Sequence, residues 1–424
     1  MGIAKTASTI ADIGLAAEGE RRIQWVAQHS PVLNTLRENE LGDGSLRGVN
    51  IALAIHLEAK TAYLALILAE AGADVTVGGS NPHTTRDDVC AALVRRGLTV
   101  HATQGAPRAE WERQLELVLD SGPDILVDDG AELVSRLVSR KPYLIERVRA
   151  SSEETTTGVL KLRAMHREGA LPWPAIAAND AACKHLFDNR YGTGQTVIEA
   201  ILRATNIWAG GKTVVTVGYG WCGKGVARYA QGVNARVIVS EVDEVKALEA
   251  FADGHGVMSM EQAAAVGDIF VTCTGGIDAI RGEHVERMKD GAILANAGHY
   301  EHEINLGELR RMSVDVAEVR HRVTEYRLRD GRRIHVIAGG ELVNIAAGDG
   351  HPIEIMDLTF AVQALSAHYL VNHSKELDAG VHALPAEIDR RIAGIKLRTV
   401  GATLGELTPR QRHYSGSWRQ DGDA

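Results

Sequence analysis

The apolar positions of this chain fall into short runs that alternate with helical stretches. In the first half, runs of four to seven residues are bounded by turn residues, which is typical of buried strands. Between the runs, apolar residues recur at the spacing of one helix face. Strands separated by helices predict a parallel sheet with right-handed crossovers. The predicted strands are 49–55, 74–77, 98–101, 124–127 and 175–178, and the helices include 61–71, 86–96 and 108–119.

The same alternation returns in the second half and is followed by a helical end. The predicted strands there are 213–217, 236–240, 268–273, 292–295 and 334–337, with a helix at 355–371. The fold class is therefore α/β, with two doubly wound, Rossmann-like parallel-sheet domains, a cleft between them and a short helical C-terminal segment. We expect a first domain over 1–190 that 352–384 completes, a second over 191–351, and an oligomerisation segment over 385–424.

A glycine-rich turn opens the second domain. Gly218, Gly220 and Gly223 follow the apolar run 213–217 directly and open a helical stretch, and Glu241 ends the next strand 23 residues after Gly218. This context is typical of dinucleotide binding, in which the glycines allow a tight turn, close approach of the pyrophosphate and close helix packing. The helix N-terminus offers unpaired N–H groups to the phosphates. Glu241 favours NAD over NADP because a carboxylate accepts from a ribose diol and repels a 2′-phosphate; the competing interpretation is a glycine turn in a ligand-free α/β unit.

Composition narrows the classes of partner. The 424 residues are 45% hydrophobic, 24% charged and 4% aromatic, with a formal net charge of −9. This balance argues against nucleic acid or an anionic membrane as the main partner. The four cysteines are scattered without metal spacing, and no apolar run approaches the length of a membrane span. We therefore expect a soluble cytoplasmic protein with small-molecule partners and no metal.

Polar residues stand where the predicted strands of the first domain end. His56 follows the first strand, Asp128 and Asp129 follow the fourth, and Asn179 and Asp180 follow the fifth. Taken singly, such an acid often caps the next helix, and a lone histidine is more often structural than catalytic. Together with Lys184, Asp188 and a dense polar stretch at 153–157, they predict an acid–base constellation opposite the NAD site.

In the second domain, the segment 296–299 (Asn-Ala-Gly-His) follows a strand, at the expected position of the nicotinamide. Asn344 and His351 come later, in the stretch LVNIAAGDGHP. Taken alone, each of these residues fits a core or turn position as well as a functional one.

These motifs resemble the S-adenosylhomocysteine hydrolase family. The resemblance runs from about residue 11 to about residue 418 with no large gap. It is carried by SEETTTG (152–158), ND…K…FDNRYGTGQ (179–195), VGYGWCGKG (217–225), the NAGH segment and LVNIAAGDGHP (342–352). It implies reversible hydrolysis of S-adenosyl-L-homocysteine to adenosine and L-homocysteine with tightly bound NAD. The chemistry agrees, because a thioether is a poor leaving group until a neighbouring ketone makes elimination accessible.

The resemblance also implies roles for individual residues. The catalytic group is His56, Asp129, Glu154, Lys184, Asp188 and His299, with Lys184 as the proton acceptor near the 3′-hydroxyl. Substrate binding is expected of Glu58, Lys60, Thr61 and His351. The expected cofactor contacts are Thr155, Thr156, Thr157, Asn189, Gly218, Gly220, Trp221, Cys222, Gly223, Glu241, Lys246, Thr274, Asn296, Ala297, Gly298 and Asn344.

The sequence departs from the commonest family pattern at three places. Lys60 stands where a glutamate usually contacts the adenine edge, and a lysine can only donate hydrogen bonds. This favours a 6-oxo purine, as in S-inosylhomocysteine, unless Glu58 takes over as acceptor. Lys246 replaces an asparagine near the NAD ribose, and the end of the chain lacks the tail that clamps NAD in a neighbouring subunit. The change at Lys60 and the missing tail, together with Trp221 and Cys222 in the glycine loop, resemble a short-tailed subgroup of archaea and some bacteria. Weaker, more exchangeable NAD is one hypothesis.

The primary prediction is an adenosylhomocysteinase, with S-inosyl-L-homocysteine hydrolysis by the same mechanism as the alternative. More distant alternatives are an ordinary NAD-dependent dehydrogenase and a non-catalytic NAD-binding regulatory relative. The resemblance implies a homotetramer, with a dimer also possible.

Overall fold

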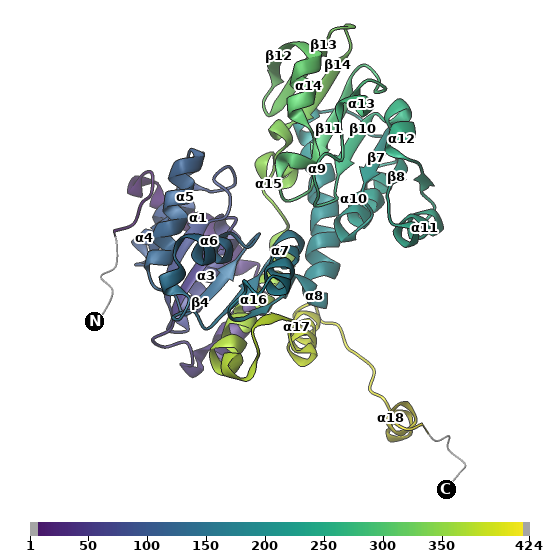
Figure 1. The fold of residues 1–424 in the computed structure, drawn as a ribbon. Helices are drawn as coiled ribbons and strands as arrows, with labels where there is room; N and C mark the ends of the chain where they lie inside the picture. Colours follow the sequence, from purple (N-terminus) through teal and green to yellow (C-terminus); the bar gives the residue numbers. More distant parts are fainter. Residues whose placement is uncertain (1–6, 419–424) are drawn as a thin grey trace.

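The structure is a computed structural model that describes residues 7–418, and it forms two lobes, each built on a sheet with helices packed against it (Figure 1). The first sheet has the strand order β15-β6-β5-β4-β1-β2-β3, and all its pairs are parallel. The predicted strands of the first half are all present, and the sequence patterns missed β5 and β15. The strands are β1 (Asn50–Ile55), β2 (Asp74–Gly79), β3 (Thr99–His101), β4 (Ile125–Asp128), β5 (Ala150–Glu153), β6 (Pro174–Ile176) and β15 (Gly380–His382).

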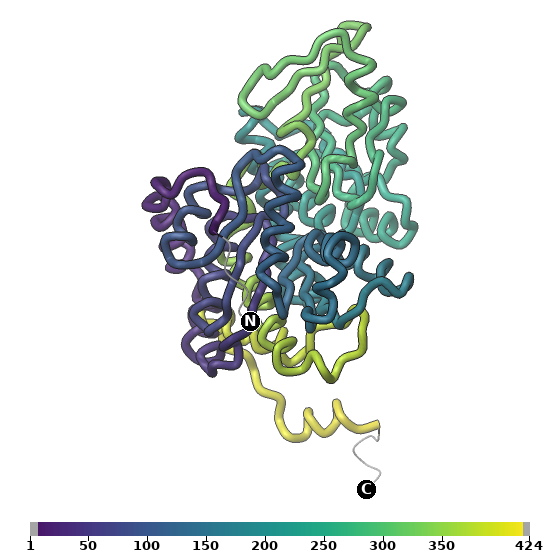
Figure 2. Tube along the Cα trace, turned by 60° about the vertical axis from the view of Figure 1, so that its left-hand side comes forward, coloured from purple at the N-terminus to yellow at the C-terminus, as the bar shows by residue number. Residues whose placement is uncertain are grey.

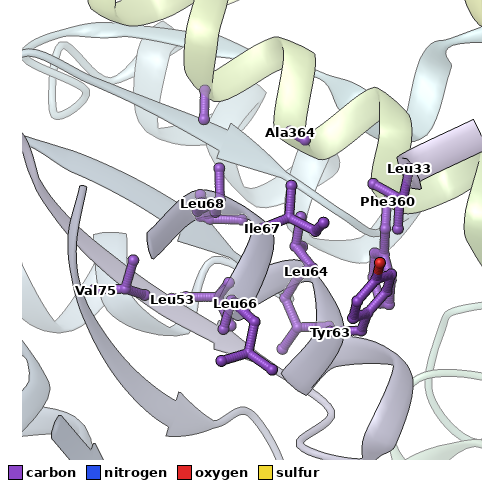
Figure 3. Close-up of a cluster of buried hydrophobic side chains, with 14 of the residues drawn as sticks. Leu33, Leu53, Tyr63, Leu64, Leu66, Ile67, Leu68, Val75, Phe360 and Ala364 are labelled. Atoms are coloured by element: carbon purple, nitrogen blue, oxygen red, sulfur yellow. The ribbon is translucent and has the colours of Figure 1, made fainter. Parts of the chain in front are cut away.

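Helices from both ends of the chain cover this first sheet. The N-terminal ones are α1 (Ala16–Gln28), α2 (Pro31–Asn39), α3 (Ala59–Glu70), α4 (Asp87–Arg95), α5 (Arg108–Asp120), α6 (Glu132–Arg140), α7 (Thr156–Arg167) and α8 (Ala182–Lys184). The long helix α16 (Ile353–His373) returns from the second lobe and packs on α3 and α2. Figure 3 shows Phe360 and Ala364 of α16 beside Leu33, Tyr63 and Ile67 in this core.

The second sheet has the order β12-β13-β14-β11-β10-β7-β8-β9. Its strands are β7 (Thr213–Val217), β8 (Arg236–Ser240), β9 (Gly256–Val257), β10 (Ile269–Thr272), β11 (Ala292–Asn296), β12 (Ser313–Arg320), β13 (Val323–Leu328) and β14 (Arg333–Ile337). Its helices are α9 (Thr193–Thr205), α10 (Trp221–Gly232), α11 (Glu244–Ala252), α12 (Met260–Val266), α13 (Gly282–Val285), α14 (Leu306–Met312) and α15 (Val343–Ala346). The expectation of an all-parallel sheet is corrected at one edge, because β12 and β13 form an antiparallel hairpin that continues onto β14.

The hairpin escaped prediction because its edge strand carries no buried apolar run. Every residue of β12 is at least partly exposed, and charged side chains alternate with valine and alanine along it. Charged edge strands of this kind resist pairing with other chains. The second sheet is therefore mixed. The pairs of β12 with β13 and of β13 with β14 are antiparallel, and the pairs from β14 through to β9 are parallel.

The chain leaves the first lobe through a π-helical stretch at His185–Gly192 and returns to it at α16. After α17 (Ala386–Thr399), which packs on α2 and α16, an exposed arm ends in α18 (Pro409–Gly416) and extends away from the body (Figure 2). Within residues 7–418, no helix is both long and apolar enough to cross a membrane. All four cysteines are free.

Candidate active site between the two sheets

The ends of strands from both sheets open onto one cavity. Its volume is about 1230 Å³, larger than the roughly 300–1,000 Å³ that a single drug-sized ligand needs. The first sheet contributes residues that follow β1, β4 and β5, and the second sheet contributes those that follow β7, β8 and β11. The cavity therefore has room for a dinucleotide and a second ligand. Among the predicted site residues, Gly223 and Asn296 are the two that do not line it.

The glycine loop has the geometry that dinucleotide binding requires. Gly218 has a φ of +98°, and a Cβ on it would lie 3.0 Å from the carbonyl oxygen of Cys273. A Cβ on Gly220 would meet nothing within 4 Å, so the backbone is open to a ligand there. A Cβ on Gly223 would lie 2.0 Å from the carbonyl oxygen of Gly218, so this glycine serves helix packing rather than ligand contact. The space around each of the three glycines is consistent with the role predicted for it.

Glu241 lies at the end of β8 beside the glycine loop. Its carboxylate accepts backbone N–H groups from Tyr219 at 2.7 Å, Val242 at 2.8 Å and Asp243 at 3.1 Å. These bonds hold the acid at the rim of the cavity, where a ribose diol would meet it. Lys246 also lines the cavity, and its ammonium lies 3.9 Å from the Asp243 carboxylate.

Asn344 supplies an independent sign that a ligand belongs in the cofactor half of the cavity. The side chain is 1% exposed, and its Nδ2 donates to the Thr196 hydroxyl at 3.2 Å. Its carbonyl oxygen Oδ1 is buried and accepts no hydrogen bond among the described residues. A buried acceptor without a donor is costly. The carboxamide of a nicotinamide would supply the missing donor, so the residues present fit NAD.

Asn296 has a different task from the cofactor contact expected of it. The side chain is fully buried, and its Nδ2 donates to the carbonyls of Gly298, Tyr300 and Gly340 at 2.9 to 3.2 Å. Its Oδ1 accepts from Gly298 N and the Thr272 hydroxyl. The amide therefore shapes the loop that presents Ala297, Gly298 and His299 to the cavity.

A second buried residue, which the sequence patterns missed, shapes the neighbouring loop. Glu303 is 1% exposed and accepts from Thr274 N, the Thr274 hydroxyl and Gly275 N at 2.7 to 2.8 Å. The backbone of 274–275 thereby lies along the cavity, where Thr157 of the other lobe approaches it. No sequence motif marks Glu303, because its partners lie about 30 residues before it.

The substrate half of the cavity is centred on Lys184. The ammonium donates to Asn189 Oδ1 at 2.7 Å and lies 3.2 Å from Asp188 Oδ2 and 3.6 Å from Glu154 Oε1. Asp188 and Asn189 belong to the π-helical stretch, an irregular helix that places them on the same side as Lys184. Asn189 in turn donates to Asn179 at 2.9 Å. The residues that the sequence placed one turn apart do converge.

Burial and neighbouring charges determine which side chains of this group are protonated. Burial disfavours the Lys184 ammonium, but Asp188 and Glu154 outweigh burial and raise its pKa. Burial likewise opposes ionisation of Asp188, but Lys184 and His351 lower its pKa well below the usual range. Burial raises the pKa of Glu154 to about 8, against the opposing effect of Lys184. In the ligand-free protein, Lys184 is therefore a cation and Glu154 holds a proton at neutral pH.

Helix α16 adds two polar residues that the sequence analysis did not identify. Gln363 Nε2 donates to Glu154 Oε2 at 2.6 Å, and the Thr359 hydroxyl donates to Asp188 Oδ2 at 2.8 Å. Both side chains are fully buried on a helix whose buried residues are mostly apolar. Their spacing of four residues places them on one helix face. Two polar residues at this spacing in a predicted, mostly apolar helix are the signal by which the sequence could have indicated a polar neighbour.

A second acid–base group lies across the cavity. Asp129 is fully buried and accepts from the Ser80 hydroxyl at 2.7 Å. Its two carboxylate oxygens lie 3.5 Å from His56 Nε2 and 3.9 Å from His299 Nδ1. His56 Nδ1 lies 2.8 Å from the Thr84 hydroxyl, which itself donates to a backbone carbonyl. Nδ1 of His56 is therefore the donor, and Nε2 faces the acid.

The pKa shifts of this group follow from its mixed charges. Burial lowers the pKa of His299, although Asp129 opposes the shift. Burial would raise the pKa of Asp129, but His56 and His299 outweigh it and lower the pKa. The group thus offers an ionised carboxylate beside a neutral imidazole, a pairing suited to proton transfer.

The neighbouring acid Asp128 has the structural role that was one of its two interpretations. Its carboxylate accepts the N–H groups of Leu133 and Val134 at 3.0 and 2.9 Å, at the start of α6. Glu153 accepts from Gly130 and Ala131, both at 2.9 Å. Together these two acids fix the turn that carries Asp129.

The residues predicted to contact the purine make polar contacts with other residues of the protein. Lys60 Nζ lies 2.9 Å from Glu58 Oε2 and donates to the carbonyl of Asp349 at 3.0 Å. The Thr61 hydroxyl donates to the carbonyl of His56 at 2.6 Å. His351 Nδ1 lies 2.8 Å from Asp188 Oδ1. Lys60 keeps one donor free for a ligand, because an ammonium has three.

Two lobes of parallel-sheet type, a glycine loop open to a dinucleotide and buried acid–base residues on one cavity define an NAD-dependent enzyme of the doubly wound class. Comparison with known families is more specific. The family model "S-adenosyl-L-homocysteine hydrolase, NAD binding domain" matches residues 189–350, and the model "S-adenosyl-L-homocysteine hydrolase" matches residues 7–141.

Relatives align over nearly the whole chain. The S-inosyl-L-homocysteine hydrolase of Methanopyrus kandleri is 51% identical over 97% of this chain and 97% of its own length. The adenosylhomocysteinases of Thermococcus kodakarensis and Aquifex aeolicus are each 50% identical over 96% of this chain and cover 97% and 98% of their own lengths. The chain belongs to the S-adenosyl-L-homocysteine hydrolase family.

Proposed function

We propose that this protein catalyses the reversible hydrolysis of S-adenosyl-L-homocysteine to adenosine and L-homocysteine, with NAD held as a resident cofactor. The observation that carries the proposal is the single cavity that joins the glycine loop to two buried acid–base groups. The glycine loop, Glu241 and Asn344 would hold NAD, which would supply reversible hydride transfer at the 3′-carbon of the nucleoside. The residues of the chain supply the proton transfers around that exchange.

The Lys184 group serves the ribose hydroxyls. Oxidation at the 3′-carbon requires the hydroxyl to lose its proton, and the Lys184 ammonium lies within 3.6 Å of both Asp188 and Glu154. Lys184 is the residue that takes this proton, for which it must first release its own proton to water in the cavity, because Glu154 is already protonated in the ligand-free protein. Asp188 stays ionised and stabilises the cation on Lys184.

The Asp129 group serves the opposite side of the sugar. A ketone at the 3′-carbon acidifies the 4′-hydrogen, and a base can then remove it and expel the thiol from the 5′-carbon. Asp129 and the two histidines beside it supply a base and a proton donor for this elimination and for the addition of water.

Deuterium exchange tests the mechanism. Turnover in D₂O should yield homocysteine and adenosine in equal amounts, with deuterium at the 4′-carbon of the adenosine. Direct displacement of the thiol by water would leave that position unlabelled. Steady NADH accumulation would instead indicate an ordinary dehydrogenase, and no product at all would indicate a non-catalytic relative.

A specific observation favours S-inosyl-L-homocysteine as a second substrate. The free donor of Lys60, which is 7% exposed and lines the cavity, suits the 6-oxo group of hypoxanthine. Glu58 lies beside it and offers an acceptor to a 6-amino group. Relatives of similar identity carry both names.

The ratio of kcat/KM for the two substrates decides between the bases. Lys60→Gln should lower kcat/KM for the inosyl substrate by about 10-fold to 100-fold relative to the adenosyl substrate, the discrimination of a lost charge-assisted hydrogen bond. An unchanged ratio would remove Lys60 from base recognition.

We also propose a cytoplasmic homotetramer. The four free cysteines support a reducing compartment. The exposed arm carries Leu404, Leu407 and Tyr414 at 53 to 71% exposure, and another subunit would cover them. Light scattering during size-exclusion chromatography distinguishes a tetramer from the dimer.

A further inference from the structure

Tyr300 lies where the two lobes meet. It follows His299 in the loop after β11 of the second lobe, and its hydroxyl reaches two residues of the first lobe. The hydroxyl accepts from Lys161 Nζ at 2.7 Å and donates to Glu132 Oε1 at 2.9 Å. The Lys161 ammonium also lies 4.9 Å from the centre of the Tyr300 ring. One hydroxyl thus makes two hydrogen bonds to charged groups, which are the strong kind.

The partners of Tyr300 are themselves fixed within the first lobe. Lys161 donates to the carbonyl of Gly130 at 2.9 Å and lies 3.7 Å from the Glu132 carboxylate. Glu132 also pairs with Arg136 at 3.2 Å. The first lobe therefore presents a preformed acceptor and donor to the tyrosine hydroxyl.

The contact surface between the lobes is tight at this point. A Cβ on Gly130 would lie 2.6 Å from His299 Nε2 and 3.1 Å from the Tyr300 hydroxyl. Only a glycine leaves room for the loop of the other lobe to approach so closely. Another polar contact between the lobes, from Asn81 and His83 to Glu341, is longer at 3.4 and 3.6 Å.

Tyr300 also determines where His299 lies. The two rings pack edge to face with centres 4.4 Å apart. Asn296 holds the backbone of the same loop through the carbonyl of Tyr300 at 2.9 Å. His299 and Asp129 come from different lobes, so their distance of 3.9 Å depends on how the lobes meet.

We propose that the Tyr300 hydroxyl is an interlobe clasp: by bonding Lys161 and Glu132, it stabilises the closed arrangement that brings His299 to Asp129. Tyr300 is a positioning residue in this account, since it acts through His299. The proposal rests on the proposed function for its effect on turnover, but the closure itself is independent of the reaction.

Tyr300→Phe tests the clasp because it keeps the ring and removes both hydrogen bonds. Lys161 and Glu132 remain paired with each other, so no charge is left alone and the variant should fold. We expect kcat/KM to fall about 10-fold to 100-fold, as for other bonds to charged groups. Tyr63→Phe is the matched control: its hydroxyl bonds Asn34 within the first lobe, and its loss should leave kcat/KM unchanged.

Two further readouts separate a clasp from a local effect. In solution scattering, NAD-loaded Tyr300→Phe should have a larger radius of gyration than the wild type, whether or not the wild type hydrolyses substrate. Adding Glu132→Leu to Tyr300→Phe should cost less than Glu132→Leu alone, because the bond between Tyr300 and Glu132 is already lost. Wild-type scattering from Tyr300→Phe would overturn the clasp, even if turnover fell, as would additive effects of the two substitutions.

Discussion

The two halves of the cavity are built in opposite ways. The cofactor half uses backbone: three glycines within six residues make the turn, the opening and the helix contact. The substrate half uses buried charge: Lys184 lies between Asp188 and Glu154, and Gln363 reaches Glu154 from 209 positions away. The cofactor half depends on the absence of side chains at three positions. The substrate half depends on buried opposite charges that stabilise one another.

This difference determines what a substitution in each half of the cavity changes. Where backbone approaches a ligand, an added Cβ blocks the ligand or the packing, and the charge distribution is unaffected. In the substrate half, removal of one group shifts the pKa of the others, since each proton is held by its neighbours. Substitutions in the two halves should therefore separate binding of the cofactor from chemistry on the substrate.

The largest expected effect is in the substrate half. Lys184→Met removes the cation between two carboxyl groups, and we expect hydrolysis to fall by about 10³-fold, within the range of a lost acid–base group. NAD binding, measured by calorimetry, should stay near that of the wild type because Lys184 belongs to the substrate half. Turnover within about tenfold of the wild type would remove Lys184 from the chemistry.

The cofactor half is tested by two matched substitutions. Gly220→Ala should fold normally, because its Cβ meets nothing within 4 Å, and should weaken NAD binding by about 10-fold to 100-fold. Gly223→Ala should instead lower the free energy of unfolding by about 1–3 kcal/mol, since its Cβ would lie 2.0 Å from a carbonyl oxygen. The comparison fails if Gly220→Ala is the unstable variant and Gly223→Ala the one with weak NAD binding.

A smaller effect is expected from helix α16. Gln363→Leu removes the amide that donates to Glu154, and we expect kcat to fall about tenfold through the lost bond to a carboxylate. Ser366→Ala on the same helix is the control, because the Ser366 hydroxyl is buried without a partner among the described residues. Equal effects of the two substitutions would show that α16 contributes packing alone.

The smallest effect is on stability. Burial raises the pKa of Glu154 from its usual value to about 8 in the folded protein. A raised pKa stabilises the fold fully below the unfolded value, and this stabilisation is lost as pH rises through the folded value. The free energy of unfolding should thus fall between the usual pKa of a glutamate, about 4.5, and the folded value of about 8, and Glu154→Gln should flatten part of that slope. Denaturant titrations that give the same slope for both proteins would contradict the shift.

The sequence predicted the strands and glycines of the cofactor half well. Strands β7 and β8 lie where the apolar runs placed them, and the three glycines differ in what an added Cβ would meet. Strand β5 (Ala150–Glu153) was missed because its buried residues include two serines and a glutamate, so it shows no apolar run. Tertiary contacts, rather than local pattern, decide such a strand.

The substrate half of the cavity could be predicted only in part. Lys184 and Asp188 are four residues apart, and the strand-end rule brought them together with Glu154. Gln363 and Glu303 were missed because the residues that they bond lie far away along the chain. A single sequence does not show which distant residues meet in the fold. The resemblance to a known family supplied the roles, and the structure supplied the neighbours.

The central claim is that both halves of the cavity serve one hydrolytic cycle. Stopped-flow absorbance of NADH, recorded while homocysteine is assayed, tests it most directly. With excess S-adenosyl-L-homocysteine, NADH should rise to no more than one per active site and fall back, while homocysteine accumulates over many turnovers. NADH that grows in step with product, or homocysteine release without any NADH signal, would contradict the account.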